Sequence, residues 1–180
     1  MGGPPVLAKG DVQEQRYVAA AEEFGAALVR LARAYEADPD LRLDLVQEIH
    51  LALWRSFERF DARCSVRTWT YRVAHNVATS HVLKRKRLRV DRLASLDEVA
   101  DAPDGDDPEA TAGDRQVMER LMALVETLKP ADRQVMLLYL EDLDAAAISE
   151  ITGLSSGAVA VKIHRLKSIL TRRFQQGGAA

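Results

Sequence analysis

The stretch SVRTWTYRVAHNVATSHVLKRKRLR, residues 65–89, combines an apolar side, a polar side and a basic end. Four apolar residues recur at steps of three and four, which predicts one side of a helix: Val66, Trp69, Val73 and Val77. The residues on or near the other side can donate hydrogen bonds, stack or carry positive charge: Arg67, Tyr71, Arg72, His75, Asn76 and Thr79. The last turns hold the cations: Lys84, Arg85, Lys86, Arg87 and Arg89.

Two interpretations of this predicted helix stand side by side. A helix with one apolar side, one polar and aromatic side and a cationic end suits the backbone and exposed bases of a nucleic acid. A surface helix whose arginines are merely solvated has the same composition. This stretch alone does not favour either interpretation, so the rest of the chain has to decide between them.

The bulk composition predicts a folded protein. The chain has 180 residues, of which 47% are hydrophobic, enough for the core of one ordinary domain or two small ones. No apolar run approaches the roughly 20 residues that span a bilayer, and the N-terminus lacks the apolar core of a secretory signal. The single cysteine, Cys64, excludes an internal disulfide framework and fits a reducing compartment. We therefore expect a cytoplasmic protein without membrane insertion.

The distribution of charge matters more than the net charge of −2, which by itself argues against nucleic-acid binding. Residues 1–92 hold 16 Lys and Arg against 12 Asp and Glu, and residues 115–180 hold nine against seven. Residues 93–114 hold eight acids and no Lys or Arg, and their Pro and Gly interrupt the aliphatic periodicity. An acidic linker is therefore predicted between two mildly basic parts.

Helical periodicity predicts an all-α chain of two small helical domains. Helices are expected over residues 11–37 and 40–57, with Val18 and Leu45 on their buried stripes. Trp54 lies beside the second stripe, and a Trp near a helix end is more often core than contact surface. The expected parts are a disordered N-terminus (1–10), a first domain (11–92), a flexible acidic linker (93–114), a second domain (115–174) and a disordered tail (175–180).

The second domain, which starts with a helix that turns Val117 inward, ends in the pattern of a helix-turn-helix. Asp144 is placed to cap a short helix, Ala147 is small enough for a helix crossing, and Gly153 supplies a left-handed turn position. The outer face of the last helix offers hydroxyl and cationic groups: Ser155, Ser156, Lys162, His164, Arg165 and Lys167. Such a helix can enter a DNA major groove. A plain helical hairpin is the alternative, but cap, small residue, glycine and basic face coincide here.

Nothing in the sequence indicates catalysis or a resident cofactor. The four histidines form no metal-ligand set with cysteines or carboxylates: His50, His75, His81 and His164. No Gly-rich phosphate loop and no pair of nucleophile and base stands out. We therefore expect no metal, no cofactor and no enzymatic activity.

The order of these motifs resembles bacterial sigma factors. The chain carries DLVQE at residues 44–48, FERFD at 57–61 and WTYRVAHNVA at 69–78, followed by the basic run, the linker and the helix-turn-helix. It looks like the extracytoplasmic-function (ECF) group of the sigma-70 family, small factors reduced to regions 2 and 4. The resemblance covers about residues 15–174 and implies an RNA polymerase sigma factor that directs promoter recognition, DNA melting and transcription initiation.

The resemblance also implies roles for matching residues. In the family, one segment docks on the clamp coiled coil of the polymerase largest subunit. The residues that match it here are Asp44, Leu45, Gln47, Glu48 and Trp54. Those matching the reader of the −10 element, where a base is flipped from the stack, are Arg72, His75, Asn76, Thr79, Lys84, Arg85, Lys86 and Arg87. The residues expected to contact the −35 element are Ser155, Ser156, Lys162, His164, Arg165 and Lys167. This second domain is also expected to dock on the flap of the second-largest subunit, and an anti-sigma factor is the expected regulator.

Two other functions stay open at this point. A sigma-like decoy would sequester an anti-sigma factor without touching DNA, but it has no need of the basic residues 84–89. A helix-turn-helix regulator whose first domain only dimerises would present an apolar seam where residues 44–48 present a polar patch. The family pattern is not complete either, since Ser80 replaces a frequent acidic residue and Ala160 and Val161 replace frequent hydrogen-bonding ones.

Overall fold

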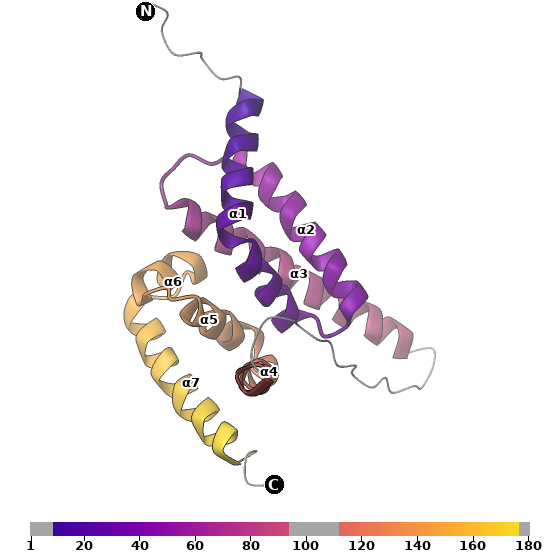
Figure 1. The fold of residues 1–180 in the computed structure, drawn as a ribbon, viewed down its shortest axis with the longest axis vertical. Coiled ribbons are helices and arrows are strands. Elements are labelled where there is room, and N and C mark those ends of the chain that lie inside the picture. The colour runs from indigo at the N-terminus through magenta and orange to yellow at the C-terminus, as the bar shows by residue number, and fades with distance from the viewer. Residues whose placement is uncertain (1–8, 94–111, 177–180) are drawn as a thin grey trace, which may run out of the picture.

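A computed structural model of the chain describes residues 9–93 and 112–176 (Figure 1). These residues form seven helices and no strand: α1 (Lys9–Tyr35), α2 (Pro39–Phe57), α3 (Val66–Leu93), α4 (Ala112–Glu126), α5 (Pro130–Leu140), α6 (Ala145–Thr152) and α7 (Ser156–Gln176). The all-α prediction is confirmed. The predicted linker lies outside the described residues except at its two ends, which belong to α3 and α4, and so does most of each predicted disordered terminus.

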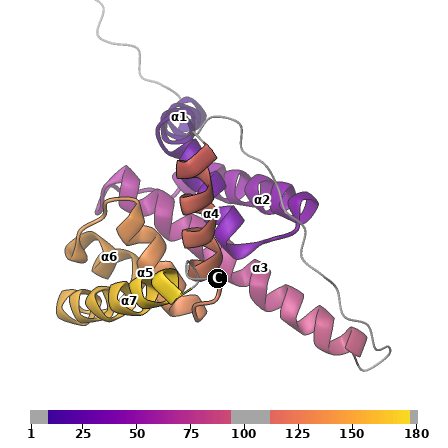
Figure 2. The ribbon, with the colours of Figure 1, turned by 60° about the horizontal axis from the view of Figure 1, so that its bottom comes forward.

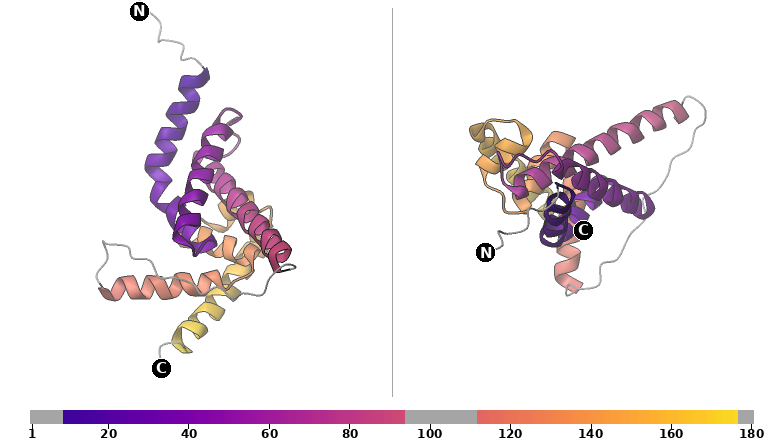
Figure 3. Two further views of the ribbon diagram at one scale, coloured as in Figure 1. Left: turned by 90° about the vertical axis from the view of Figure 1, so that its right-hand side faces the viewer. Right: turned by 90° about the horizontal axis from the view of Figure 1, so that it is seen from above.

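Two helical bundles pack directly on one another. α1, α2 and α3 form the first bundle, and α4 to α7 form the second, with α7 on the side away from α2 (Figure 1). α5 and α6 contact α3, and α4 contacts α1. The C-terminal end of α3 projects beyond both bundles (Figures 2 and 3). This end carries the basic run, so the fold presents the cations away from the core.

The start and the buried face of α2 follow from its sequence. Asp38 takes the N-cap position, and its Oδ1 accepts the backbone N–H groups of Asp40 at 3.0 Å and Leu41 at 3.1 Å. Pro39 occupies the first turn, where a missing N–H costs nothing. The buried residues recur at helical spacing: Leu45, Ile49, Leu53 and Phe57. The predicted helix and its stripe are confirmed.

The buried side of α3 differs from the predicted one. Tyr71 and His75, predicted on the polar side, are only 2% and 1% exposed, and Ala74 and Ala78 are fully buried with them. The predicted apolar side is only partly buried: Val66, Trp69, Val73 and Val77. The reason is that α3 contacts α1 and α2 as well as α5 and α6, so more than one of its sides is covered.

Three apolar residues predicted to be buried are instead exposed. Val18 is 44% exposed, because the adjacent Tyr17 makes the contact with α2, with its hydroxyl 3.1 Å from Nδ1 of His50. Val117, near the start of α4, is 54% exposed, and Trp54, near the end of α2, is 43% exposed. Helical spacing predicts which residues share a side, but the position of the neighbouring helix decides which side is covered.

α6 and α7 form the predicted helix-turn-helix. Oδ1 of Asp144 accepts the N–H of Ala147 at 2.8 Å and so caps α6. Gly153 ends α6 in the left-handed conformation, with φ at 76°, and its N–H bonds a carbonyl of the preceding turn. The two helices are bent by 106° at this break, an angle typical of DNA-binding motifs of this type. Val159 and Leu166 bury the inner side of α7.

Replacing Gly153 with alanine is expected to lower the free energy of unfolding by about 1 kcal/mol, since an L side chain adopts a left-handed backbone only at a cost. A Cβ at this position meets no atom within 4 Å, so the loss comes from the backbone alone. Urea unfolding of the full chain measures it. Gly153→Asn is the matched control and should lose less, because asparagine tolerates this conformation. Equal losses in the two variants would contradict the explanation.

Candidate nucleic-acid and protein interfaces

The projecting end of α3 is a cationic surface. Among the side chains that the structure describes there, the exposed cations are Lys84, Lys86 and Arg87. Asn76, Ser80 and Lys84 are all exposed and spaced by four residues, so they extend this surface along one face toward the middle of the helix. A shallow groove of about 450 Å³ is lined by Ser80, Leu83, Lys84, Arg87 and Leu88. The arrangement fits a polyanionic strand that follows the helix.

Two leucines of this surface were missed by sequence reasoning. Leu83 and Leu88 are 53% and 54% exposed among the cations. Exposed apolar side chains between positive charges can contact the faces of bases while the cations hold phosphates. For Leu83 the available signal was that it does not continue the spacing of the Val66 to Val77 stripe.

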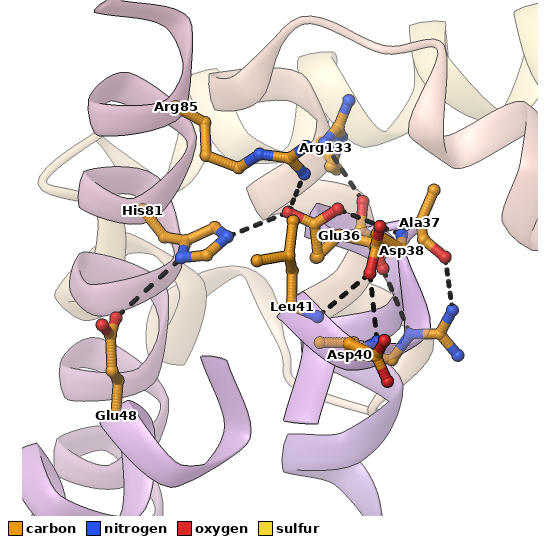
Figure 4. A network of polar contacts seen from close by, with 11 residues as sticks. Glu36, Ala37, Asp38, Asp40, Leu41, Glu48, His81, Arg85 and Arg133 are labelled. Carbon is orange, nitrogen blue, oxygen red and sulfur yellow. Dashed lines mark hydrogen bonds and ion pairs between the residues drawn. The ribbon is translucent and has the colours of Figure 1, made fainter. Parts of the chain in front are cut away.

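A buried carboxylate anchors the basic end of α3 to the first bundle. Glu36, directly after α1, is 3% exposed and pairs with Arg85 and, at 2.9 Å, with Nε2 of His81 (Figure 4). It also accepts the N–H of Asp38 at 3.1 Å. The other ring nitrogen of His81 lies 3.9 Å from a carboxylate oxygen of Glu48 in α2. Arg85 therefore has a partner inside the protein, unlike its exposed neighbours in the basic run.

The substitution Glu36→Gln is expected to lower the free energy of unfolding by about 2 kcal/mol at neutral pH, since it breaks a largely buried ion pair whose Arg85 partner is partly exposed. Burial raises the pKa of Glu36, but hydrogen bonds from Arg85 and His81 lower it more, so the net pKa lies below its ordinary value. A carboxyl group of this kind stabilises the fold above its unfolded pKa. That contribution is lost as the pH falls through the folded pKa.

Unfolding curves at about pH 7 and at decreasing pH below about 4 measure this contribution. The parent chain should lose stability over that range more steeply than Glu36→Gln. Glu58→Gln, a change at an exposed carboxylate, is the control and should follow the parent chain. Parallel curves for the parent chain and Glu36→Gln would contradict the proposed role of the buried carboxylate.

Three residues predicted to contact the −10 element lie in or beside the packing of the bundles. His75 is buried, its Nδ1 lies 3.1 Å from the hydroxyl of Tyr35, and burial lowers the pKa of His75 to about 3. It is therefore neutral and has no surface to offer a DNA strand, which corrects its predicted role. Arg72 donates from Nη2 to the carbonyl of Glu150 in α6 at 2.6 Å. Thr79 is half-buried.

The predicted polymerase-docking segment of α2 is an exposed surface with one exception. Asp44, Gln47, Glu48 and Trp54 are exposed. Leu45 is fully buried, so it supports this surface from the core and makes no direct contact with a partner. The prediction for Leu45 as a contact residue is corrected accordingly.

The same surface of α2 holds apolar residues that sequence reasoning missed. Leu43 is 62% exposed and Leu51 is 48% exposed. Leu43, Gln47 and Leu51 are spaced by four residues, so they form a line with Trp54 three residues further on. Exposed leucines beside a tryptophan are typical of a protein-binding surface. Their position off the buried stripe was the available signal.

The outer face of α7 presents most of the predicted −35 set. Its exposed members are Ser155, Ser156, His164, Arg165 and Lys167. Lys162 is half-buried and pairs with Asp132 of α5, which also accepts from Arg165 at 3.1 Å. Nζ of Lys167 lies 3.2 Å from the hydroxyl of Tyr139. Contacts with α5 thus hold three of these cations on one side of the helix.

Known families match both bundles. The family Sigma-70 region 2 matches residues 20–88, and the family Sigma-70, region 4 matches residues 118–170. The two matches follow each other in one chain and together cover more than half of it. The chain belongs to the sigma-70 family. The first bundle, with its projecting basic helix, is sigma region 2, and the second, with its helix-turn-helix, is sigma region 4.

The curated relatives of this sigma-70 protein include ECF factors. The ECF RNA polymerase sigma factor SigG of Mycobacterium tuberculosis is 29% identical over 150 residues, which cover 71% of this chain and 40% of SigG. The ECF RNA polymerase sigma-E factor of Haemophilus influenzae is 28% identical over 142 residues, which cover 73% and 74% of the two chains. The chain thus spans about two fifths of the length of SigG.

Two solved structures share the fold of this sigma-70 protein. CnrH, in complex with the cytosolic domain of CnrY, superposes with a TM-score of 0.64 and 18% identity, over 94% of this chain and 99% of CnrH. The sigma factor RpoE of Bartonella quintana, in complex with the anti-sigma factor NepR, superposes with a TM-score of 0.66 and 17% identity, over 88% and 97%. Both likenesses extend over regions 2 and 4.

Among residues 9–93 and 112–176, no three His, Cys, Asp or Glu side chains come together as metal ligands would. Within the same residues no single helix has the length and hydropathy to cross a membrane, and α6 with α7 reaches that threshold only as a bent pair.

Proposed function

We propose that this sigma-70 protein directs transcription initiation as an ECF factor of RNA polymerase in the cytoplasm. The observation that carries the proposal is that regions 2 and 4 follow each other in one chain. The protein supplies promoter recognition and strand opening, while the polymerase supplies the catalysis.

Region 2 has two surfaces for this function. The exposed face of α2, with Asp44, Gln47, Glu48 and Trp54, docks on the clamp coiled coil of the largest polymerase subunit. The exposed face of α3 holds the melted −10 strand, with Asn76, Lys84, Lys86 and Arg87 among the contacts and Thr79 at their edge. Support comes from the exposure of these groups and from the anchoring of the helix end through Glu36.

Region 4 reads the −35 element and docks on the flap of the second-largest subunit. Its DNA contacts are Ser155, Ser156, His164, Arg165 and Lys167, with Lys162 held toward α5. A cleft of about 830 Å³ is lined by residues that include Leu143, Ala160, Ile163 and Lys167, and it offers an apolar floor to a protein segment. Since CnrH and RpoE were each solved with a partner bound, we infer that an anti-sigma factor also binds this chain.

Association with core RNA polymerase tests the proposal. The full chain, mixed with purified core enzyme, should elute with it in gel filtration, and the complex should make thymines of a bound promoter reactive to permanganate. A chain that neither joins the core enzyme nor opens DNA would overturn the proposal. A chain that binds an anti-sigma factor but not the core enzyme would be the decoy.

A further inference from the structure

The turn after α5 brings a carboxylate of region 4 onto region 2. Glu141 accepts two hydrogen bonds from Arg30 of α1, Nε to Oε1 at 2.8 Å and Nη2 to Oε2 at 2.7 Å. The hydroxyl of Tyr71 in α3 donates to the same carboxylate at 3.4 Å. Glu141 is mostly buried, with 19% of its side chain exposed, while Arg30 is about half exposed. The carboxylate therefore sits in a site formed by two helices of region 2.

Two further arginines, both in α3, donate to backbone carbonyls of region 4 at the same boundary. Arg67 donates to the backbone carbonyl of Glu141, and Arg72 donates from Nη2 to that of Glu150 at 2.6 Å. Three guanidinium groups of region 2 thus donate hydrogen bonds to one carboxylate and two backbone carbonyls of region 4. We call these contacts the clasp.

The region 2 side of the clasp has the chemistry of a phosphate site. Arginine binds carboxylate and phosphate with the same forked, two-bond geometry, and the Arg30–Glu141 pair has that geometry. Because the two carbonyls carry no formal charge, the site holds more positive charge than its occupant neutralises. A phosphodiester of a nucleic-acid strand offers the same single negative charge and paired oxygen acceptors as the Glu141 carboxylate.

The clasp also lies in line with the proposed −10 surface. Arg72, Asn76, Ser80 and Lys84 are spaced by four residues, so they share one face of α3 over about 18 Å. The clasp is at the Arg72 end of that line, and the exposed cations are at the other. A strand that follows α3 from its basic end arrives at the position that Glu141 and Glu150 occupy.

Resting on the proposed function, we propose that Arg30, Arg67 and Arg72 form a backbone-phosphate site for the promoter strand, and that Glu141 occupies it when regions 2 and 4 are closed on each other. Glu141 thereby keeps the free protein from binding DNA until the regions separate. DNA and region 4 compete for the same guanidinium groups. The apparent affinity for DNA then equals the affinity of the open form multiplied by the fraction of molecules that are open.

The test compares two neighbouring carboxylates in the full chain. Glu141→Gln removes the charge from the clasp, whereas Asp142→Asn removes the same charge one residue away. Asp142 has a φ of 57°, which asparagine tolerates, so this control keeps the turn. Energy transfer between dyes at Ala19→Cys and Thr171→Cys, with Cys64→Ser, reports opening, and fluorescence anisotropy with a short mixed-sequence single-stranded DNA reports binding.

Glu141→Gln is expected to lower energy transfer and to raise the affinity of the free chain for single-stranded DNA roughly tenfold, a factor that corresponds to one charge-assisted contact of a partly exposed pair. Asp142→Asn should leave the energy transfer unchanged. It should raise the affinity for single-stranded DNA only slightly, in a salt-dependent way. Arg30→Gln should also open the chain, but with a smaller gain in affinity, because it removes a phosphate ligand as well. Equal gains for Arg30→Gln and Glu141→Gln, or no gain for Glu141→Gln, would overturn the proposal.

The proposed function is tested separately in the same samples by association with core polymerase. If the parent chain and Glu141→Gln both join the core enzyme but bind single-stranded DNA equally, the clasp proposal is overturned and the function stands. If none of the chains joins the core enzyme, the function itself fails. Urea unfolding measures the folded fraction of every variant. Where that fraction is below that of the parent chain, the DNA affinity is calculated from the concentration of folded protein.

Discussion

Replacing Lys84, Lys86 and Arg87 together with alanine is expected to reduce the affinity of the polymerase complex for promoter DNA about 100-fold at physiological salt. All three side chains are exposed on the projecting end of α3. Each phosphate contact changes the logarithm of the binding constant by about 0.7–0.9 per decade of salt. Between 1 M and about 0.15 M salt, one contact therefore contributes about fourfold to fivefold, and three contribute about 100-fold.

The salt dependence is the more specific measurement for this variant. The slope of log K against log salt should fall by about two to three, one counterion release for each lost contact. Arg85 is left in place, because it pairs with Glu36 and its loss would destabilise the helix end. The control is the triple change of exposed cations elsewhere, Arg59, Arg63 and Lys129 to alanine. An unchanged slope in the α3 variant would show that its cations are only solvated.

Replacing Trp54 with alanine is expected to weaken binding to core polymerase at least about 30-fold, the effect of losing an aromatic residue at the centre of a protein interface. Trp54 is 43% exposed and shares its surface with Leu51 and Leu43. Its backbone carbonyl accepts from Gln13, a contact that alanine retains, so the fold should persist. Titration of labelled full chain with core enzyme measures the affinity.

Val29→Ala is the matched control for Trp54→Ala. Val29 is 49% exposed on α1, so its truncation also removes exposed apolar surface, but outside the proposed docking face. This control should bind core polymerase like the parent chain. If Trp54→Ala binds as tightly as Val29→Ala, the exposed face of α2 is not the polymerase-binding surface.

Local sequence patterns predicted the helices and much of the core of the first bundle. In α2, the Asp38 cap, Pro39 and the stripe from Leu45 to Phe57 could all be recognised, because each depends on residues within one helix. The same holds for Asp144 and Gly153 in the helix-turn-helix. These features need no information on how the helices pack.

The wrong predictions for α3, and the ion pairs that were not predicted, depend on packing between distant segments. Tyr71 and His75 have polar groups and were expected on the open side of α3, but both are buried. Their rings pack against Phe24 and Tyr35 of α1. Glu36 resembles a solvated acid at a helix end, and its pairing with His81 and Arg85, 45 and 49 residues later, explains its burial. Arg30 and Glu141 are 111 residues apart, and spacing alone does not indicate their contact.

Transcription by core RNA polymerase with and without the full chain tests the central claim most directly. Fragmented genomic DNA of the source cell is the template, and the 5′ ends of the transcripts are sequenced. The sigma assignment predicts discrete start sites that depend on the chain and share two upstream elements, one near −10 and one near −35. Their use should fall in the α3 and Trp54 variants but not in the matched controls. The absence of any start site that depends on the chain, with a core enzyme that responds to another sigma factor, would contradict the assignment.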